Sequence, residues 1–176
     1  MIKKLFSVLF SIVLLASFYV YAVLMEDENA REAPQWMVEE TQPPIGPIDT
    51  LLSQDANRLA STMGTAVPLP RTLKEGKVES SRYHGYTVRL LTAKSDTLSV
   101  RGVRPLSAAP LIRKDNLVFS SSKEALFGYP VMIAQNGTSV YYYFATENAA
   151  FEISVAATTK EEAASLLSTL AIVNQT

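Results

Sequence analysis

The chain has 176 residues, 48% of them hydrophobic, and a formal net charge of −1 at pH 7. It has no cysteine, which excludes disulfides, thiolate metal ligands and cysteine nucleophiles. This length allows one globular domain with its own core after a targeting segment and a linker, and the sequence carries no cofactor-binding motif.

The charge is unevenly distributed along the chain. Residues 71–114 hold ten Lys and Arg against three acids, whereas residues 26–48 hold six acids against one Arg. A basic stretch between acidic ones indicates local anion attraction. Because the chain as a whole has no basic excess, we do not expect it to bind nucleic acid.

The N-terminal segment, residues 1–25, has the pattern of a membrane anchor or a signal peptide. No charge occurs from Leu5 to Met25, a run of about 21 residues that makes about 31 Å of helix, enough to cross a bilayer. Lys3 and Lys4 precede the run and acids follow it. The sequence therefore predicts that the membrane is contacted through residues 5–25, with the C-terminal domain outside the cytoplasm.

Cleavage after Ala22 is the alternative, because Val20 and Ala22 are small residues at the spacing that signal peptidase requires. The domain would then be secreted. Against cleavage, the apolar run exceeds the usual signal core and continues to Met25. We expect a single-pass anchor and keep secretion as the alternative.

Residues 26–47 are predicted to be an acidic linker. They contain six acids and four prolines, a composition that favours an extended, self-repelling chain. Residues 48–176 are then predicted to form a single domain.

A helix is predicted over residues 50–63. Its apolar residues recur at helical spacing, Asp49 is placed to cap its N-terminus, and Gly64 is placed to end it. The segment that follows, "TAVPLP", is predicted to be a loop.

Two strands around "KSD" are predicted to form a hairpin. A three-residue loop at 94–96 places Tyr86, Val88 and Leu90 on one face with Leu98 and Val100, and sets Arg89 opposite Arg101 on the other face. The next strand is expected at "LVFS".

The C-terminal third predicts a three-stranded meander. Asn136-Gly137 is a strong two-residue hairpin signal, and a second turn is expected at Thr146 to Ala149. Both turns gather the same apolar residues on one face: Val131, Ile133, Val140, Tyr142, Phe144, Phe151, Ile153 and Val155.

A capped amphipathic helix is predicted at 160–172. Thr159 and Glu162 form a capping box. The apolar stripe that begins at Ala163 is expected to pack on the meander. The fold class is therefore α+β, with an antiparallel sheet of about five or six strands.

The segment "GYPVMIAQNGTSVYYYFATENAAFEISVAATTKEEAASLLSTL" resembles the C-terminal half of bacterial extracytoplasmic domains of unknown function. Such domains often follow a transmembrane helix, including in some anti-sigma factors. The resemblance implies an α+β domain outside the cell membrane, and a Mog1/PsbP-like fold has the same order of elements. It implies no catalytic residues.

Two surfaces are candidate sites. Four arginines of the basic stretch are candidates for binding an anion on the solvent face of the first hairpin: Arg82, Arg89, Arg101 and Arg104. The face of the meander opposite its core is a candidate interaction face, carrying Tyr141, Tyr143, Met132 and Glu152.

Catalysis and metal binding are not expected. His84 is the only histidine, too few for a typical zinc site, and is interpreted as a turn residue. Ser120 and Lys123 match S-x-x-K, but the companion motifs of penicillin-binding proteins are absent. We therefore expect a non-enzymatic interaction, sensing or assembly module, with binding of an anionic lipid headgroup or wall polymer as the alternative and a Ser/Lys hydrolase as a remote one.

Overall fold

The computed structural model describes residues 43–113, 117–157 and 159–174, except for the side chains of residues 121–124 and 160. The predicted membrane segment, residues 1–25, and most of the predicted linker, residues 26–47, lie outside these ranges. Within them, no helix is long and apolar enough to span a membrane.

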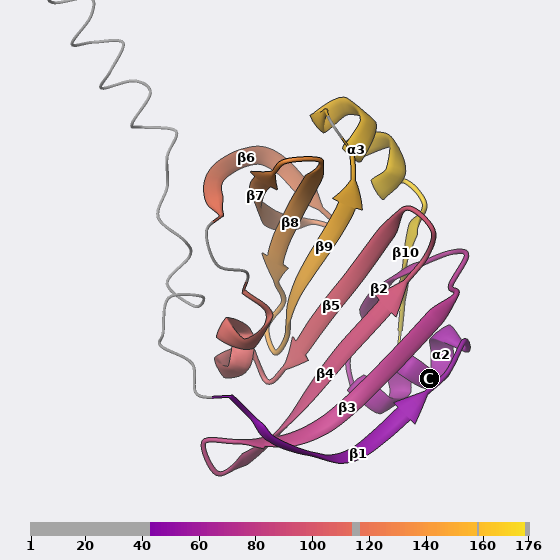
Figure 1. Cartoon of the computed structure of the whole chain (residues 1–176), viewed down its shortest axis with the longest axis vertical. Helices are drawn as coiled ribbons and strands as arrows, with labels where there is room; N and C mark the ends of the chain where they lie inside the picture. Colours follow the sequence, from indigo (N-terminus) through magenta and orange to yellow (C-terminus); the bar gives the residue numbers. More distant parts are fainter. Residues whose placement is uncertain (1–42, 114–116, 158, 175–176) are drawn as a thin grey trace, which may run out of the picture. The chain divides into compact units, whose positions relative to one another are not determined.

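An antiparallel sheet of eight strands forms the body of the structure (Figure 1), with the spatial order β1-β3-β4-β5-β9-β8-β7-β6. The α+β class is thus confirmed, but the sheet has more strands than the five or six expected. In that order, the strands are Ile45–Leu52, Glu75–Tyr83, Tyr86–Lys94, Leu98–Arg104, Ala150–Ala156, Ser139–Ala145, Tyr129–Asn136 and Val118–Leu126. Strand β1 begins inside the range predicted as linker.

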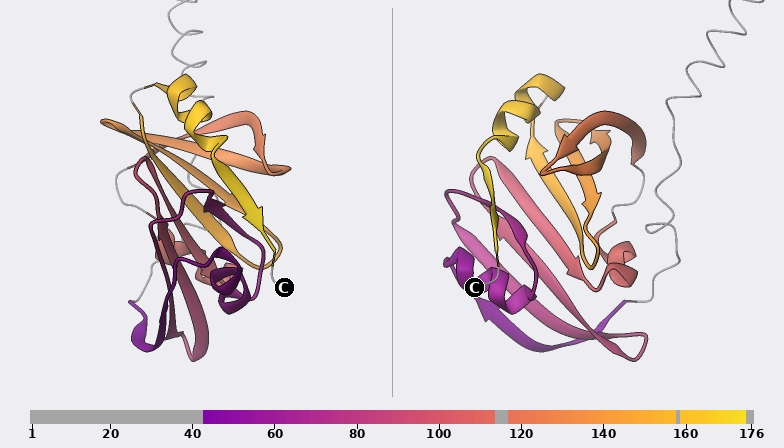
Figure 2. Two further views of the ribbon diagram at one scale, coloured as in Figure 1. Left: turned by 90° about the vertical axis from the view of Figure 1, so that its right-hand side faces the viewer. Right: turned by 180° about the vertical axis from the view of Figure 1, so that it is seen from behind.

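One face of the sheet, here called the inner face, is covered by two helices and a small second sheet (Figure 2). The helices are α2 (Ala56–Met63) and α3 (Lys160–Leu167), and the small sheet pairs β2 (Val67–Pro70) with β10 (Leu170–Val173). The opposite, outer face carries the short 3-10 helix η2 (Leu106–Ile112). Both faces are therefore partly buried.

The meander prediction is confirmed in its faces. All eight apolar residues predicted to share one face belong to the main core on the inner face. The second turn pairs Phe144 with Phe151 as expected. The first pairs Ile133 with Tyr142 rather than Val140, and this two-residue shift leaves every side chain on its predicted face because strands alternate with period two.

The helix predicted at 50–63 is wrong in its first half. Residues up to Leu52 belong to β1 and pair with β3, and the helix begins at Ala56. Asp55 is its N-cap, with Oδ1 accepting a hydrogen bond from Asn57 N at 2.9 Å, whereas Asp49 accepts from Thr50. Gly64 ends the helix with φ of 71°, as predicted.

The C-terminal helix is shorter than the predicted 160–172. Thr159 caps it as expected, because its hydroxyl accepts from Glu162 N at 3.1 Å. The helix ends at Leu167, and residues 170–173 form β10. Strand β10 pairs with β2, the segment predicted as a loop; this pairing joins segments about a hundred residues apart, so local periodicity gives no sign of it.

Candidate functional site

The register of the first hairpin decides which arginines meet. Arg89 pairs with Arg104, and Thr92 pairs with Arg101. The predicted Arg89–Arg101 pair is therefore wrong: Lys94 pairs with Ser99, so four residues rather than three separate the paired positions. An odd shift turns one strand's side chains to the other face, which places Arg89 with Arg104 on the inner face and Arg101 on the outer face.

Arg89 and Arg104 converge on the C-terminal end of helix α2. Nη1 of each guanidinium donates to the same acceptor, the carbonyl oxygen of Met63, at 3.4 Å and 3.2 Å respectively. Arg104 Nη1 also donates to Gly64 O at 2.5 Å. The last carbonyls of a helix lack partners within it and carry the negative end of its dipole, so the helix end attracts both cations.

Gly64 permits this close approach. Its φ of +71° is a conformation that L side chains rarely adopt, and a Cβ there would lie 2.2 Å from Arg104 Nη1 and 2.9 Å from Arg89 Nη1. The glycine that ends the helix thus also makes room for the two guanidiniums. The sequence predicted Gly64 as the residue that ends the helix, but not its closeness to the arginines.

A cleft of about 460 Å³ opens beside the arginine pair. It is lined by Tyr86, Thr87, Arg89, Arg104, Pro105 and Ser107, and Ser107 Oγ donates to Tyr86 Oη at 3.2 Å. Among the ion pairs within the described part of the chain, none involves either guanidinium. Two like charges directly opposed across strands, in a half-buried place with hydroxyl groups nearby, are an arrangement that favours an anion.

The other two candidate arginines lie elsewhere. Arg82 is exposed on β3, where it pairs with Thr87. Arg101 lies on the outer face, with Nη1 3.7 Å from Glu152 Oε1, and its guanidinium donates at 3.2 Å to the carbonyl oxygens of Leu111 and Ile112 at the end of η2. Only Arg89 and Arg104 of the four predicted residues form a pair.

The predicted aromatic interaction face is packed rather than exposed. Tyr143 is 0% exposed, Tyr141 8% and Glu152 1%, while Met132 is half-buried. Tyr143 Oη donates to Glu152 Oε2 at 2.5 Å. The prediction of an exposed platform is wrong because this part of the sheet is covered on both faces.

His84 is a turn residue, as predicted. It has φ of 45° and precedes Gly85 in the two-residue connection between the paired residues Tyr83 and Tyr86. In the described residues, no group of His, Asp and Glu is arranged to hold a metal ion.

The S-x-x-K segment does not start a helix. Ser120 lies in strand β6 and its Oγ donates to Ile133 O at 3.3 Å, while the Lys123 side chain is outside the described residues. Strand geometry does not support the Ser/Lys hydrolase hypothesis, because in that motif the lysine is presented to the serine from a helix.

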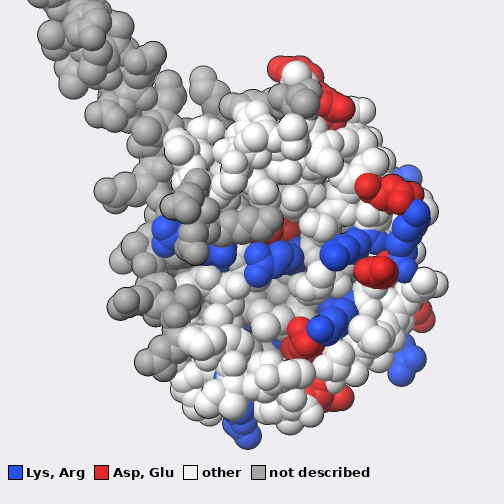
Figure 3. Space-filling model, in the orientation of Figure 1, with Lys and Arg blue, Asp and Glu red and all other residues white. Residues whose placement is uncertain are grey.

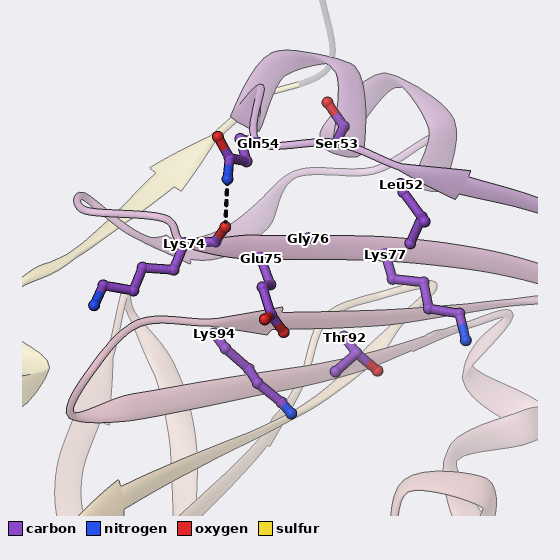
Figure 4. Close-up of a pocket in the computed structure, with 9 residues that line it drawn as sticks. All are labelled: Leu52, Ser53, Gln54, Lys74, Glu75, Gly76, Lys77, Thr92 and Lys94. Atoms are coloured by element: carbon purple, nitrogen blue, oxygen red, sulfur yellow. Dashed lines mark hydrogen bonds between the residues drawn. The ribbon is translucent and has the colours of Figure 1, made fainter.

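A second cleft, of about 670 Å³, lies at the other end of β4. Its walls come from the end of β1 and its connection to α2, from Lys74 and the start of β3, and from the end of β4 (Figure 4). Sequence reasoning missed this cleft because it depends on how the β1–α2 connection folds over β3.

The outer face of the sheet is in front in Figure 1. In the same view, Figure 3 shows that Lys and Arg side chains gather in a band across this face, with acids among them.

Comparisons with protein-family models, curated proteins and solved structures found no match.

Proposed function

We propose that this chain is a non-enzymatic binding module that acts outside the cytoplasm, tethered to or exported across a bacterial membrane, and that it binds an oxyanion through Arg89 and Arg104. The favoured ligand chemistry is a phosphate group of a lipid headgroup or a wall polymer. The proposed location is supported by the charge pattern of residues 1–25 and by the resemblance of the C-terminal half to extracytoplasmic domains.

One observation carries the proposal: two guanidiniums share the carbonyl of Met63 without a carboxylate partner among the described residues. A guanidinium has five N–H donors, and the contacts to the helix end occupy one donor of Arg89 and two of Arg104. The remaining donors and the adjacent hydroxyl groups can complete the coordination of an oxyanion.

The test is calorimetric titration of the purified full chain, first with inorganic phosphate and then with phosphatidylglycerol vesicles or a soluble poly(glycerol phosphate). We expect binding that weakens as salt increases, and a loss of roughly tenfold or more for Arg89→Gln or Arg104→Gln. Arg71→Gln, which removes an exposed arginine outside the cleft, is the matched control.

The result that contradicts the proposal is binding that survives the double substitution Arg89→Gln with Arg104→Gln, or equal losses in Arg71→Gln. Binding of the polymer but not the vesicles, or the reverse, identifies the source of the phosphate.

A second candidate function is protein contact through strand β1. This strand is at the edge of the sheet and exposes Ile45 by 77%, Ile48 by 60% and Leu52 by 71%. Edge strands with exposed apolar side chains readily pair with another chain. A photo-crosslinking amino acid at Ile48 should capture one defined partner in cells, whereas the same group at exposed Arg58 should not.

A further inference from the structure

The 670 Å³ cleft has a preformed architecture. Ser53 N donates to Gly76 O at 2.9 Å and Gln54 Nε2 donates to Lys74 O at 2.8 Å, so the β1–α2 connection is held against β3. A Cβ at Gly76 would lie 2.5 Å from Ser53 O. The missing side chain at Gly76 therefore lets the connection approach the strand and form one wall.

The charges of the cleft separate into two sets. Lys77 Nζ lies 2.6 Å from Glu79 Oε1, and Lys74 forms an ion pair with Asp96, so both of these lysines are neutralised by groups outside the lining. Glu75 and Lys94 remain. They are directly paired in the register of β3 and β4, both are exposed, and no ion pair joins them among the described residues.

Opposite charges in directly paired positions ordinarily attract each other. Here the carboxylate of Glu75 and the ammonium of Lys94 project on the same side of the strands without meeting (Figure 4). Thr92 and Lys77 project on that side as well, and Leu52 adds an apolar group that is 71% exposed. The methylene stem of a lysine side chain is itself apolar, so Leu52 and the stem of Lys77 place apolar surface beside the Glu75–Lys94 pair, two residues along the strands.

We infer that this cleft binds a small zwitterion, a molecule that carries an ammonium group and a carboxylate group on an apolar stem, as amino acids and short peptides do. Glu75 accepts hydrogen bonds from the ligand ammonium, and Lys94 donates to the ligand carboxylate. The apolar stem of the ligand lies against Leu52 and the stem of Lys77. This site lies on the outer face, separate from the arginine pair on the inner face.

The experiment is calorimetric titration of the full chain with 6-aminohexanoate, which has both charged groups, and separately with hexanoate and hexylamine, which each have one. We expect saturable binding of 6-aminohexanoate at millimolar concentrations and binding at least roughly tenfold weaker for the two singly charged compounds, because each charge-assisted hydrogen bond contributes about that factor or more. Equal affinity for all three compounds, or no saturable binding of 6-aminohexanoate, overturns the inference.

Two variants test the residues. Lys94→Gln and Glu75→Gln are each expected to lower the affinity for 6-aminohexanoate roughly tenfold. The exchange of Glu75→Lys with Lys94→Glu keeps the net charge and should recover binding to within roughly threefold, since the ligand can reverse its direction. Lys74→Gln, which removes a neutralised lysine of the same cleft, is the control, and a loss as large as that of Lys94→Gln would assign the binding to general positive charge.

Discussion

The substitution Arg101→Met tests the buried charge arrangement of the outer face. Glu152 is 1% exposed, whereas the Arg101 side chain is 34% exposed and lies 3.7 Å from the carboxylate. The guanidinium also donates to two carbonyl oxygens at the end of η2. Methionine fills similar space without charge or donors, so the substitution leaves a buried carboxylate without this cation and removes the donors from the η2 carbonyls.

The magnitude follows from the distance and the exposure. At 3.7 Å and an effective dielectric constant of roughly 20, the attraction is about 4 kcal/mol. Removing one partner of a fully buried pair costs about 3–5 kcal/mol, and a third of Arg101 is exposed to screening solvent. We therefore expect a loss of about 2–3 kcal/mol in the free energy of unfolding.

The assay is urea unfolding of the purified full chain, followed by circular dichroism at constant nonionic detergent. The midpoint should fall while the slope stays constant. Combining Arg101→Met with Glu152→Gln should cost less than the sum of the two single changes by about 1 kcal/mol or more, because the buried charge is gone. Additive losses, or a single-variant loss below about 0.5 kcal/mol, would refute the reasoning.

Three further predictions concern the cap of helix α2 and two glycines, and the stability change of each is measured by the same unfolding assay. Asp55→Ala should lower the free energy of unfolding by about 1 kcal/mol through loss of the α2 cap, while Asp49→Ala should change it by less than about 0.5 kcal/mol. A larger loss for Asp49→Ala than for Asp55→Ala would instead support a helix that begins at residue 50. Gly64→Ala should lower the free energy of unfolding by about 1–2 kcal/mol because the φ of residue 64 is +71°. It should also weaken phosphate binding, measured by calorimetric titration, by displacing the two guanidiniums. Unchanged phosphate binding would show that the turn at residue 64 does not position the arginines. Gly102→Ala should lower the free energy of unfolding by about 1–3 kcal/mol, since a Cβ there would lie 2.8 Å from Cε1 of Phe151, the residue paired with Gly102. An unchanged unfolding midpoint would show that the Phe151 ring can move aside without cost.

Sequence patterns predicted the meander well because two independent turns gave the same apolar face, and an error of two residues at the first turn did no harm. The first hairpin was predicted from a single turn, so no second turn was available to test its register. Strand β4 has buried residues on both faces, Val88 on the outer face and Leu91 and Ala93 on the inner face, so alternation did not select a register. A strand covered on both sides carries a weak period-two signal.

The candidate site was predicted in its residue types but not in its grouping. The four arginines of the basic stretch were identified. The loop, however, is one residue longer and starts one residue later than predicted, so the register is shifted by three residues, Arg89 pairs with Arg104, and Arg101 lies on the other face. The aromatic face was misjudged because Phe119 of β6 packs against Tyr143, a contact between segments that are distant in the sequence. Composition can indicate an anion site, but only the register determines which cations share it.

The molecule offers an internal comparison for the proposed site. Arg101 and Arg104, three residues apart on β5, contact the C-terminal carbonyls of different helices, η2 and α2. On the outer face one arginine is enough for this contact, and Glu152 balances its charge. On the inner face Arg104 already reaches two carbonyl oxygens, yet Arg89 adds a second cation to one of them and no carboxylate among the described residues balances either. Holding a helix end does not require this excess of positive charge, and an external oxyanion would supply the balance that Glu152 provides on the other face.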